Sequence, residues 1–460
     1  MKNIFYASEC GAKLNSDVYL GGGDDDTAAI QTILDKAPEL GNVHLIIDGA
    51  ALVTGLKVHS NTTIECKNQC CGFFLKDHTN KPILINANPD KDNVKDRNIT
   101  ILGGTYNGNN INQDKFRYED DTCLKEVFYD SELSDVPKMV MTVQLIGVEN
   151  VLIRDVTLKD QRRWAYLCCN FKNVSMENIM IDLEHHMPNE NQDGLHFWGP
   201  GQYLTLKNIQ GRTGDDFIAL APDEGDHKSS ITDVLIDGVV LHEADQGIRL
   251  LSRETGLLDR VHIKNVIGTY KSFGFYINCW FMGGGGNFGS IIFENINLKP
   301  LAANYINILD PFLFHIGGKM KQLVVRNVNM NECDNRNIFK FGYPFYQSRE
   351  RDDSEGLRTE FSPVKSVLIE GLHIEEKSAN DLKLPIIQIT NPIEELVIRN
   401  CEVSRHKDSD KGGCFIELDK EAKIDRLSVN NINLYNVEKD IDIKNGEIIN
   451  KHISEINKIG

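Results

Sequence analysis

Four short segments of the chain share one pattern, in which polar or acidic residues are followed at once by alternating apolar residues. They read NQDGLHFWG from Asn191, TGDDFIALA from Thr213, ADQGIRLLS from Ala244 and SFGFYINCW from Ser272. Asp193, the pair Asp215 and Asp216, and Gln246 stand just before the apolar part. Carboxyl groups that meet on neighbouring segments can do acid–base chemistry, because one can donate a proton while another accepts one.

Hydrolysis of a glycosidic bond is one reaction that needs such a pair of carboxyl groups. One protonates the leaving oxygen, and the other takes a proton from the attacking water. Strand spacing would place carboxyl groups on adjacent segments roughly 5–9 Å apart, which overlaps the separation in enzymes that invert the anomeric centre. The charges of Asp215 and Asp216, beside Asp193, should raise the pKa of one carboxyl, as a general acid requires. A single aspartate could be only a turn residue, but three together favour a function.

A short repeat supplies the framework for these segments. An alternating apolar pattern that ends in Asn, Asp or Gly recurs ten times, from NVLIRDVTL near Asp155 to RLSVNNINL near Asn431. Successive copies are mostly 23–32 residues apart, with a gap of 44 between Asn327 and Gly371. The alternation and the abundant Val and Ile predict strands. Asn and Gly readily adopt a left-handed backbone, so each copy should turn sharply there.

The repeat predicts an all-β fold, a parallel β-helix that forms a single domain over residues 1–460. No amphipathic helix of ten or more residues separates the copies, which excludes a strand–helix–strand fold. Each coil of roughly 20–30 residues should contribute three short strands. The recurring Asn residues are expected to form turns, and to stack as an interior ladder. Two polar insertions, about 108–138 and about 342–364, are expected to line a groove, or else to be solvated excursions.

A capping segment, residues 1–45, should cover the first coil, because a solenoid needs closed ends. It contains one short helix, with Asp26 or Thr27 as the N-cap. The apolar stripe of this helix is expected to consist of Ala28, Ile30, Ile33 and Leu34.

Alternation also divides the strands beside the acids into two faces. One face should point inward, and its residues should lie side by side on neighbouring strands in two rows. The first row is Leu195, Phe217, Ile248 and Phe275, and the second is Phe197, Ala219, Leu250 and Ile277. The other face should point outward: His196, Trp198, Arg249, Tyr276 and Asn278. We expect these outward residues to bind substrate together with Gln246 and Trp280, although Trp280 could equally be a core residue.

Composition argues against several classes of partner. The 460 residues include 50 Lys and Arg against 67 Asp and Glu, a formal net charge of −17 that would repel nucleic acid. No apolar run reaches the roughly 18 residues of a membrane helix. The start of the chain has no apolar core of a signal peptide, and the 11 cysteines are odd in number. These features predict a cytoplasmic protein with reduced thiols. We expect no cofactor and no metal, and an oligosaccharide as the partner. The acidic stretch Pro222 to His227 is expected to be a solvated loop rather than a calcium site.

The chain resembles the polygalacturonase-like glycoside hydrolases of family 28. NQDGLHFWG is similar to the Asn-Thr-Asp-Gly motif of that family, and GDDFIAL to its Gly-Asp-Asp motif, in the same order. Trp164 looks like a Trp that the family carries on an earlier coil. The resemblance covers most of the chain and is densest between Trp164 and Trp280.

This resemblance implies a right-handed parallel β-helix and an inverting hydrolytic mechanism. By motif position, Asp215 would be the general acid, and Asp193 and Asp216 would hold and activate water. Two motifs depart from the family. Gln246 replaces the His of Gly-His-Gly, and Tyr276-Ile277-Asn278 replaces Arg-Ile-Lys, which grips a galacturonate carboxylate. A neutral sugar, or a uronate bound differently, is therefore the expected substrate.

Three functions remain open from the sequence. The first is a hydrolase, exo-acting on an imported oligosaccharide fragment. The second is a polysaccharide lyase or epimerase on the same fold. The third is a carbohydrate-binding β-helix without catalysis, which the replacement at Gln246 leaves open.

Overall fold

The computed structural model describes most of the chain in twelve stretches. They are residues 3–114, 141–187, 191–226, 228–253, 255–278, 285–301, 312–331, 337–342, 363–376, 384–408, 413–419 and 422–459. The fold divides into two compact units, Met1–Ile231 (unit 1) and Thr232–Gly460 (unit 2). The single domain expected over 1–460 stays a prediction. The expected insertions lie mostly outside the described residues.

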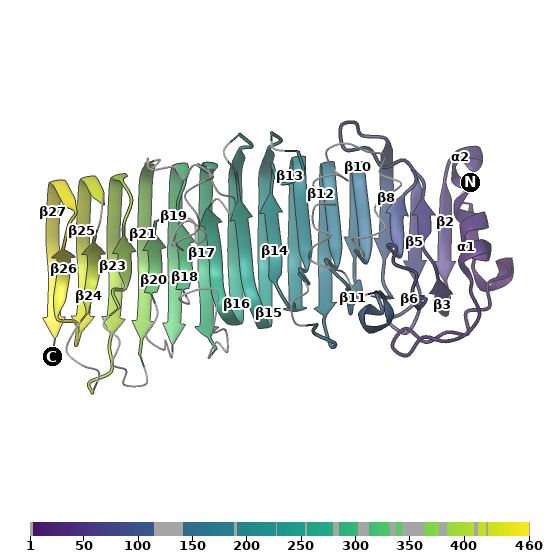
Figure 1. Cartoon of the computed structure of the whole chain (residues 1–460), viewed down its shortest axis with the longest axis horizontal. Helices are drawn as coiled ribbons and strands as arrows, with labels where there is room; N and C mark the ends of the chain where they lie inside the picture. The colour runs from purple at the N-terminus through teal and green to yellow at the C-terminus, as the bar shows by residue number, and fades with distance from the viewer. Residues whose placement is uncertain are drawn as a thin grey trace. The chain divides into compact units, whose positions relative to one another are not determined.

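Unit 1 is built from parallel strands that follow the predicted alternation. The strands are β1 (Ile4–Tyr6), β2 (Val43–Ile47), β3 (Ala50–Val53), β4 (Leu56–Val58), β5 (Thr62–Cys66), β6 (Gly72–Leu75), β7 (Leu84–Asn86), β8 (Asp96–Leu102), β9 (Thr105–Asn107), β10 (Val143–Arg154), β11 (Thr157–Lys159), β12 (Tyr166–Asp182), β13 (Leu195–Arg212) and β14 (Asp216–Ala221). Strand β10 pairs with β8 and β12, and β12 pairs with β13, all in parallel (Figure 1). Each coil therefore lies directly on the next.

Unit 2, taken by itself, has the same kind of construction. Its strands are β15 (Ile231–Leu251), β16 (Leu258–Asn278), β17 (Asn287–Pro300), β18 (Phe312–Ile316), β19 (Lys319–Asn331), β20 (Asn337–Phe341), β21 (Val364–Glu375), β22 (Ile387–Ile389), β23 (Ile393–Ser404), β24 (Cys414–Leu418), β25 (Lys423–Tyr435), β26 (Lys439–Ile443) and β27 (Glu447–Ile459). Met320 pairs with Val364, as the one wide gap in the repeat predicts. Each unit is thus a parallel β-helix, as the sequence predicted.

The strands are longer than expected. Instead of three short strands, many coils combine one long strand with one short strand, and β16 runs for 21 residues. The reason is that asparagine bends the strand without ending its hydrogen-bonded ladder. Asn178 in β12 has φ 56° and Asn208 in β13 has φ 53°, both in the left-handed region.

These asparagines also form the expected ladder, but on the outside. Asn208 Nδ2 donates to Asn178 Oδ1 at 3.0 Å. In unit 2, Asn295 Nδ2 donates to Asn265 Oδ1 at 3.0 Å and Asn327 Nδ2 to Asn295 Oδ1 at 3.1 Å. All these side chains are exposed. The core is instead filled by aliphatic and aromatic side chains with almost no exposure.

Short helices occur in unit 1, and one of them, α1, covers its first coils. They are η1 (Ser8–Cys10), α1 (Thr27–Leu34), α2 (Ala37–Leu40) and η2 (Asn110–Asn112). Helix α1 packs on β2, β3 and β4 (Figure 1), with Ile30, Ile33 and Leu34 buried as predicted.

Two details of α1 differ from expectation. Ala28 is exposed and does not belong to the apolar stripe. The residue at the N-cap position, Asp26, does not cap the helix with its side chain. Its carboxylate is buried and accepts the backbone N–H groups of Lys13 and Leu14 at 2.5 and 2.8 Å, so it fastens the N-terminal loop instead.

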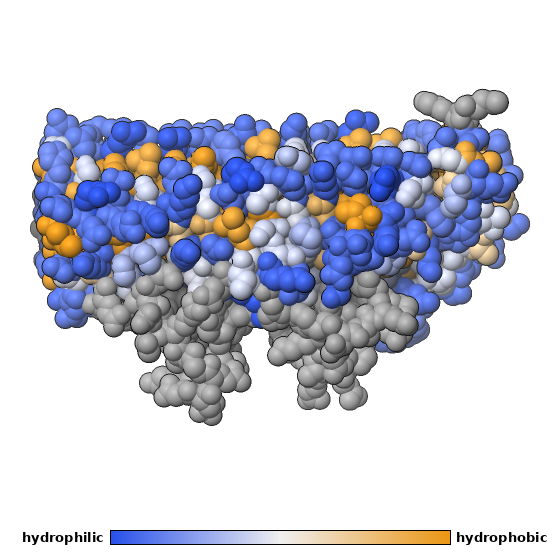
Figure 2. Space-filling view, turned by 90° about the horizontal axis from the view of Figure 1, so that it is seen from above, coloured by the Kyte–Doolittle hydropathy of each residue, from blue (hydrophilic) through white to orange (hydrophobic). Residues whose placement is uncertain are grey.

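The face seen in Figure 2 is mostly hydrophilic, with smaller apolar patches, in keeping with the acidic composition. Among the described residues, no helix is both long and apolar enough to cross a membrane.

Candidate active site

Two consecutive connections of unit 1 carry the predicted acids. Asp193 lies two residues before β13, Asp215 immediately precedes β14, and Asp216 is the first residue of β14. The backbone N–H of Gly194 donates to Asp216 O at 2.8 Å, which fastens one connection to the other. A Cβ at Gly194 would lie 2.4 Å from Phe217 O, so only glycine allows this close approach.

The three aspartates form one cluster, called here the acidic centre. One carboxylate oxygen from each of Asp193, Asp215 and Asp216 lies within 4.8 Å of the others. This is closer than the roughly 5–9 Å expected from strand spacing, because the carboxyls sit on connections that the backbone clamps together. It is also closer than the roughly 6.5–9.5 Å usual in inverting enzymes, so distance alone does not argue for inversion.

The members of the acidic centre differ in exposure. Asp193 and Asp216 are 1% and 2% exposed, whereas Asp215 is partly exposed. Within the described part of the chain, Asp193 Oδ1 is buried and has no hydrogen-bond partner. Buried carboxylate oxygens normally have partners, so this oxygen is available to a water or a ligand. A shared proton or a cation would relieve the repulsion among the three carboxyls.

His196 holds the other oxygen of Asp193. Its Nδ1 lies 2.7 Å from Asp193 Oδ2, and its Nε2 lies 2.9 Å from Glu224 Oε2. Both ring nitrogens face carboxylates, which favours a proton on each and hence an imidazolium, and Trp198 Nε1 also lies 3.0 Å from His196 Nε2. Burial lowers the pKa of His196, but the hydrogen bonds and charges of Asp193 and Glu224 outweigh it and raise the pKa to about 9.

Aromatic rings enclose this imidazolium. Trp164 stacks on His196, with ring centroids 3.7 Å apart and planes 8° from parallel. Trp164 Nε1 donates to Asn191 Oδ1, which fixes the indole. Trp198 Nε1 donates to Glu224 Oε2 at 2.8 Å, so Glu224 receives two N–H groups. A cation lying on a Trp face is favourable, and more so away from water.

Glu224 was missed by the sequence reasoning. It belongs to the stretch Pro222 to His227, which was expected to be a solvated loop. That expectation is wrong for the described residues of the stretch, because Gly225 packs against the Trp198 ring and Asp223 is buried. An acidic residue a few positions after the GDDFIAL strand was the available signal.

The expected outward residues are covered rather than open to solvent. His196 and Trp198 are 3% and 1% exposed. The described contacts therefore give them partners within the protein, whereas sugar contact was expected. The predicted register is also wrong by one residue, because Leu195 pairs with Ile218 rather than Phe217, and Phe197 with Leu220 rather than Ala219. All of these apolar side chains are buried, as expected.

Unit 2 holds a separate set of the predicted binding residues. Arg249 Nη2 donates to Gln246 Oε1 at 2.5 Å, and its guanidinium lies 5.9 Å from the ring centroid of Tyr276. Asn278 Nδ2 instead donates to Gly342 O at 3.0 Å. Arg249, Tyr276 and Asn278 are buried. Trp280 lies outside the described residues, so its role stays a prediction.

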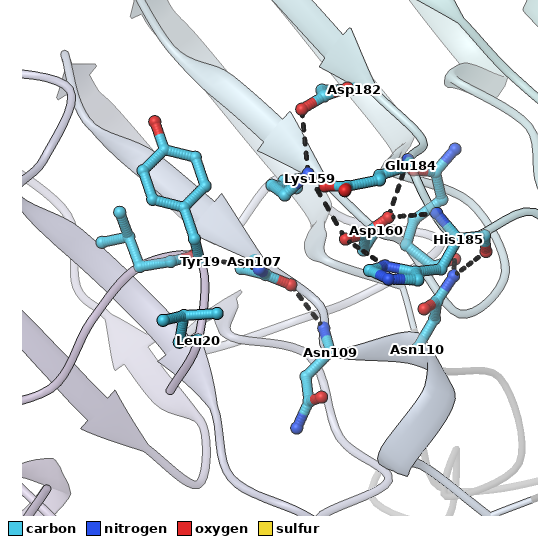
Figure 3. Close-up of polar contacts among 12 residues, drawn as sticks. Tyr19, Leu20, Asn107, Asn109, Asn110, Lys159, Asp160, Asp182, Glu184 and His185 are labelled. Carbon is cyan, nitrogen blue, oxygen red and sulfur yellow. Dashed lines mark hydrogen bonds and ion pairs between the residues drawn. The ribbon is translucent and has the colours of Figure 1, made fainter. Parts of the chain in front are cut away.

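A second acidic cluster, called here the Lys159 cluster, lies in unit 1 (Figure 3). Lys159 Nζ lies 2.9 Å from Asp182 Oδ2, 2.7 Å from Glu184 Oε2 and 3.5 Å from Asp160 Oδ2. Asp160 also accepts the backbone N–H groups of Glu184 and His185 at 2.8 and 2.9 Å. Burial lowers the pKa of Lys159, but its carboxylate partners raise it further, so the ammonium stays charged.

Among the described residues, two clusters outside the acidic centre each bring three potential metal-binding groups together. In the first, Asp160, Glu184 and His185, the ammonium of Lys159 already supplies a cation. The second is Cys414, Glu417 and Asp442 in unit 2. There, burial raises the pKa of Cys414 to about 12, which opposes the thiolate that a metal needs, and Lys444 pairs with Glu417 at 2.8 Å. Neither arrangement calls for a metal.

Comparison with known proteins identifies the class to which this fold and acidic centre belong. The family model for glycosyl hydrolases family 28 matches residues 52–310, more than half of the chain. The chain therefore belongs to glycosyl hydrolases family 28, as the motifs predicted. A polygalacturonase from Gossypium barbadense is 25% identical over 201 residues, which are 44% of this chain and 45% of that protein. The chain thus matches less than half the length of this curated relative.

Solved structures support the fold. The Yersinia enterocolitica family 28 exopolygalacturonase superposes with a TM-score of 0.53 at 14% identity, covering 100% of this chain and 78% of that one. The tailspike protein of E. coli bacteriophage HK620, solved with a pentasaccharide, gives a TM-score of 0.57 at 10% identity, covering 93% and 77%. At such identities the likeness shows the fold alone. The right-handed parallel β-helix predicted from the sequence is confirmed.

Proposed function

We propose that the chain is an inverting glycoside hydrolase that cleaves a glycosidic bond in an oligosaccharide at the acidic centre. The observation that carries the proposal is the meeting of Asp193, Asp215 and Asp216 within 4.8 Å in a member of a glycosyl hydrolase family. Hydrolysis needs a proton donor for the leaving oxygen and a base for water, and this centre holds both kinds of group.

Asp215 is the proposed general acid. It is the partly exposed member of the acidic centre, so it can reach the glycosidic oxygen of a bound sugar. Asp193 and Asp216 are the proposed base groups that hold and activate the water. Asp193 suits this role because its Oδ2 is bonded to His196 while its Oδ1 lacks a partner among the described residues. Water attack on C1 breaks the C1–O bond as Asp215 protonates the departing oxygen.

The substrate we propose is a short oligosaccharide of neutral sugars, or one whose uronate carboxylate is bound elsewhere than on Tyr276 and Asn278. Neither of these side chains is cationic, so neither can form an ion pair with a carboxylate. We also propose exo action on an imported fragment in the cytoplasm. The eight cysteines in the described stretches are all free, which suits a reducing compartment.

The test is a panel of plant and microbial oligosaccharides incubated with the wild type and with Asp215→Asn. Released monosaccharide in the wild type, with at least a thousandfold less in the variant, would support hydrolysis at this centre. A product that absorbs near 230 nm, as an unsaturated sugar does, would favour a lyase. No turnover by the wild type on any glycan would favour a carbohydrate-binding protein.

A further inference from the structure

We propose that His196 is a positioning residue for the acidic centre: clamped between Asp193 and Glu224 and stacked on Trp164, it aims the free oxygen of Asp193 at the water to be activated. This rests on the proposed function and deepens it, because it adds Glu224 and Trp164 to the groups on which turnover depends. It also replaces the substrate-binding role that the sequence suggested for His196.

The geometry leaves the imidazolium one orientation. Its two N–H groups point to opposite carboxylates at 2.7 and 2.9 Å, and the Trp164 ring lies parallel to it at 3.7 Å. Trp198 meets the His196 ring edge-on, with centroids 5.9 Å apart and planes at 90°. A ring held on two edges and one face cannot rotate, so Asp193 Oδ2 is fixed, and with it the direction of Oδ1.

The charges reinforce this geometry. Asp193 and Glu224 are the carboxylates bonded to His196, one from the connection before β13 and one from the stretch after β14. The carboxylates of Asp215 and Asp216 lie close to that of Asp193, with one oxygen of each within 4.8 Å of the others. The imidazolium thus lies beside an excess of carboxylates, and its charge offsets part of their mutual repulsion.

Glu224 makes the inference testable without altering the acidic centre. Glu224→Gln keeps the shape but removes one of the two charges that hold the imidazolium. We expect kcat to fall about tenfold, because a misdirected base loses rate rather than binding, while KM stays within about twofold. We also expect the alkaline limb of the pH–kcat profile to move down by about one pH unit, together with the NMR titration midpoint of the His196 ring.

A matched control is available in the same unit. His44 Nε2 and Glu65 Oε2 form a similar pair at 2.7 Å between β2 and β5. Glu65→Gln makes the same chemical change there and should alter neither kcat nor its pH profile. If Glu224→Gln does not fold, Trp198→Phe, which removes the indole N–H that contacts both Glu224 and His196 Nε2, should shift both readouts in the same direction by a smaller amount.

The outcomes separate this inference from the proposed function. Wild-type kcat and an unmoved alkaline limb in Glu224→Gln, with the wild type active, would overturn the positioning role alone. An inactive wild type would overturn the proposed function, and the His196 titration would then still decide whether the clamp exists. A His196 ring that titrates near its ordinary midpoint, and alike in both proteins, would overturn the clamp in either case.

Discussion

Unit 1 contains two acidic clusters built on stacked connections, and they balance their charges differently. Lys159, Asp182 and Arg212 are register partners in β11, β12 and β13, so the connections that follow these strands lie over one another. In the Lys159 cluster, the buried Asp160 receives two backbone N–H groups, His185 and the ammonium. In the acidic centre, the carboxylate of Asp193 has one described partner, His196, and one oxygen without any.

The two clusters differ in role: the acids of the Lys159 cluster stabilise the fold, whereas those of the acidic centre remain available for chemistry. Folding favours buried carboxylates whose oxygens are all bonded, because an unbonded one costs free energy. The Lys159 cluster meets this requirement within the protein. The acidic centre does not, and such a cost is typical of a catalytic site, where the missing partner is the water or the substrate.

The largest effect should come from Asp215→Asn. We expect kcat to fall at least about a thousandfold, because the proton donor is lost, while the free energy of unfolding changes by less than about 1 kcal/mol. Steady-state kinetics and urea unfolding measure the two quantities on the same protein. Asp193→Asn and Asp216→Asn should also lose several orders of magnitude in kcat. A stable Asp215→Asn variant with normal activity would remove Asp215 from the role of acid.

Lys159→Met should have the opposite effect: it should lower the free energy of unfolding and leave kcat nearly unchanged. Removing the ammonium leaves Asp160 buried, its side chain 4% exposed, beside two further carboxylates. We expect a loss of about 2–4 kcal/mol in the free energy of unfolding, with kcat within about threefold of wild type. Urea unfolding and initial rates measure this. Asp182→Asn is the milder comparison, because that side chain is 36% exposed. A large loss of kcat at unchanged stability would contradict a purely stabilising role for the Lys159 cluster.

The pH dependence of stability should report on the acidic centre. The folded pKa of His196 is about 9, above the ordinary value of roughly 6.5 in an unfolded chain. The contribution of His196 is therefore complete below about pH 6.5 and is lost as the pH rises through 9; it amounts to about 3 kcal/mol. The pKa of Lys159 is raised above an already high value, so its cluster should persist over this range.

Thermal unfolding between pH 6 and 9.5 measures this loss. It should be much smaller in Glu224→Gln, whose imidazolium has lost one carboxylate partner. Equal slopes in the two proteins would show that another group causes the loss.

The smallest effect should come from the outer asparagine ladder, which serves neither cluster. At position 208 the backbone has φ 53°, a left-handed conformation that Ala adopts less readily than Asn. Asn208→Ala therefore strains the backbone and also removes the hydrogen bond to Asn178. We expect a loss of about 1 kcal/mol in the free energy of unfolding and no change in kcat. Asn208→Gly keeps the backbone freedom and should lose less. A change in kcat would mean that the ladder transmits strain to the acidic centre.

The sequence predicted the framework well because its signal repeats. Alternation, β-branched residues and a closing Asn or Gly recur in every coil, so strand positions and the meeting of Asp193 with Asp215 and Asp216 followed. The register between β13 and β14 did not follow. All six residues of β14 are buried, so alternation disappears, and nothing in the pattern distinguishes Phe217 from Ile218 as the partner of Leu195.

The alternation of apolar and polar residues also could not predict which side chains surround the acidic centre. His196 and Trp198 occupy outward positions on β13, yet the stretch that follows β14 returns over them and supplies Glu224. That return depends on Gly225, which lacks a side chain where it touches Trp198. Similarly, Asp26 looked like a helix cap, but its oxygens meet backbone N–H groups 12 and 13 residues earlier in the chain. Contacts of this kind have no local signal in the sequence.

The measurement that tests the central claim most directly is proton NMR of the first product formed from an oligosaccharide that the wild type cleaves, with Asp215→Asn run in parallel. We predict a saturated sugar that appears first as the inverted anomer, and almost no product from the variant. A retained anomer would contradict the single displacement by water, and equal product from Asp215→Asn would place the chemistry away from the acidic centre.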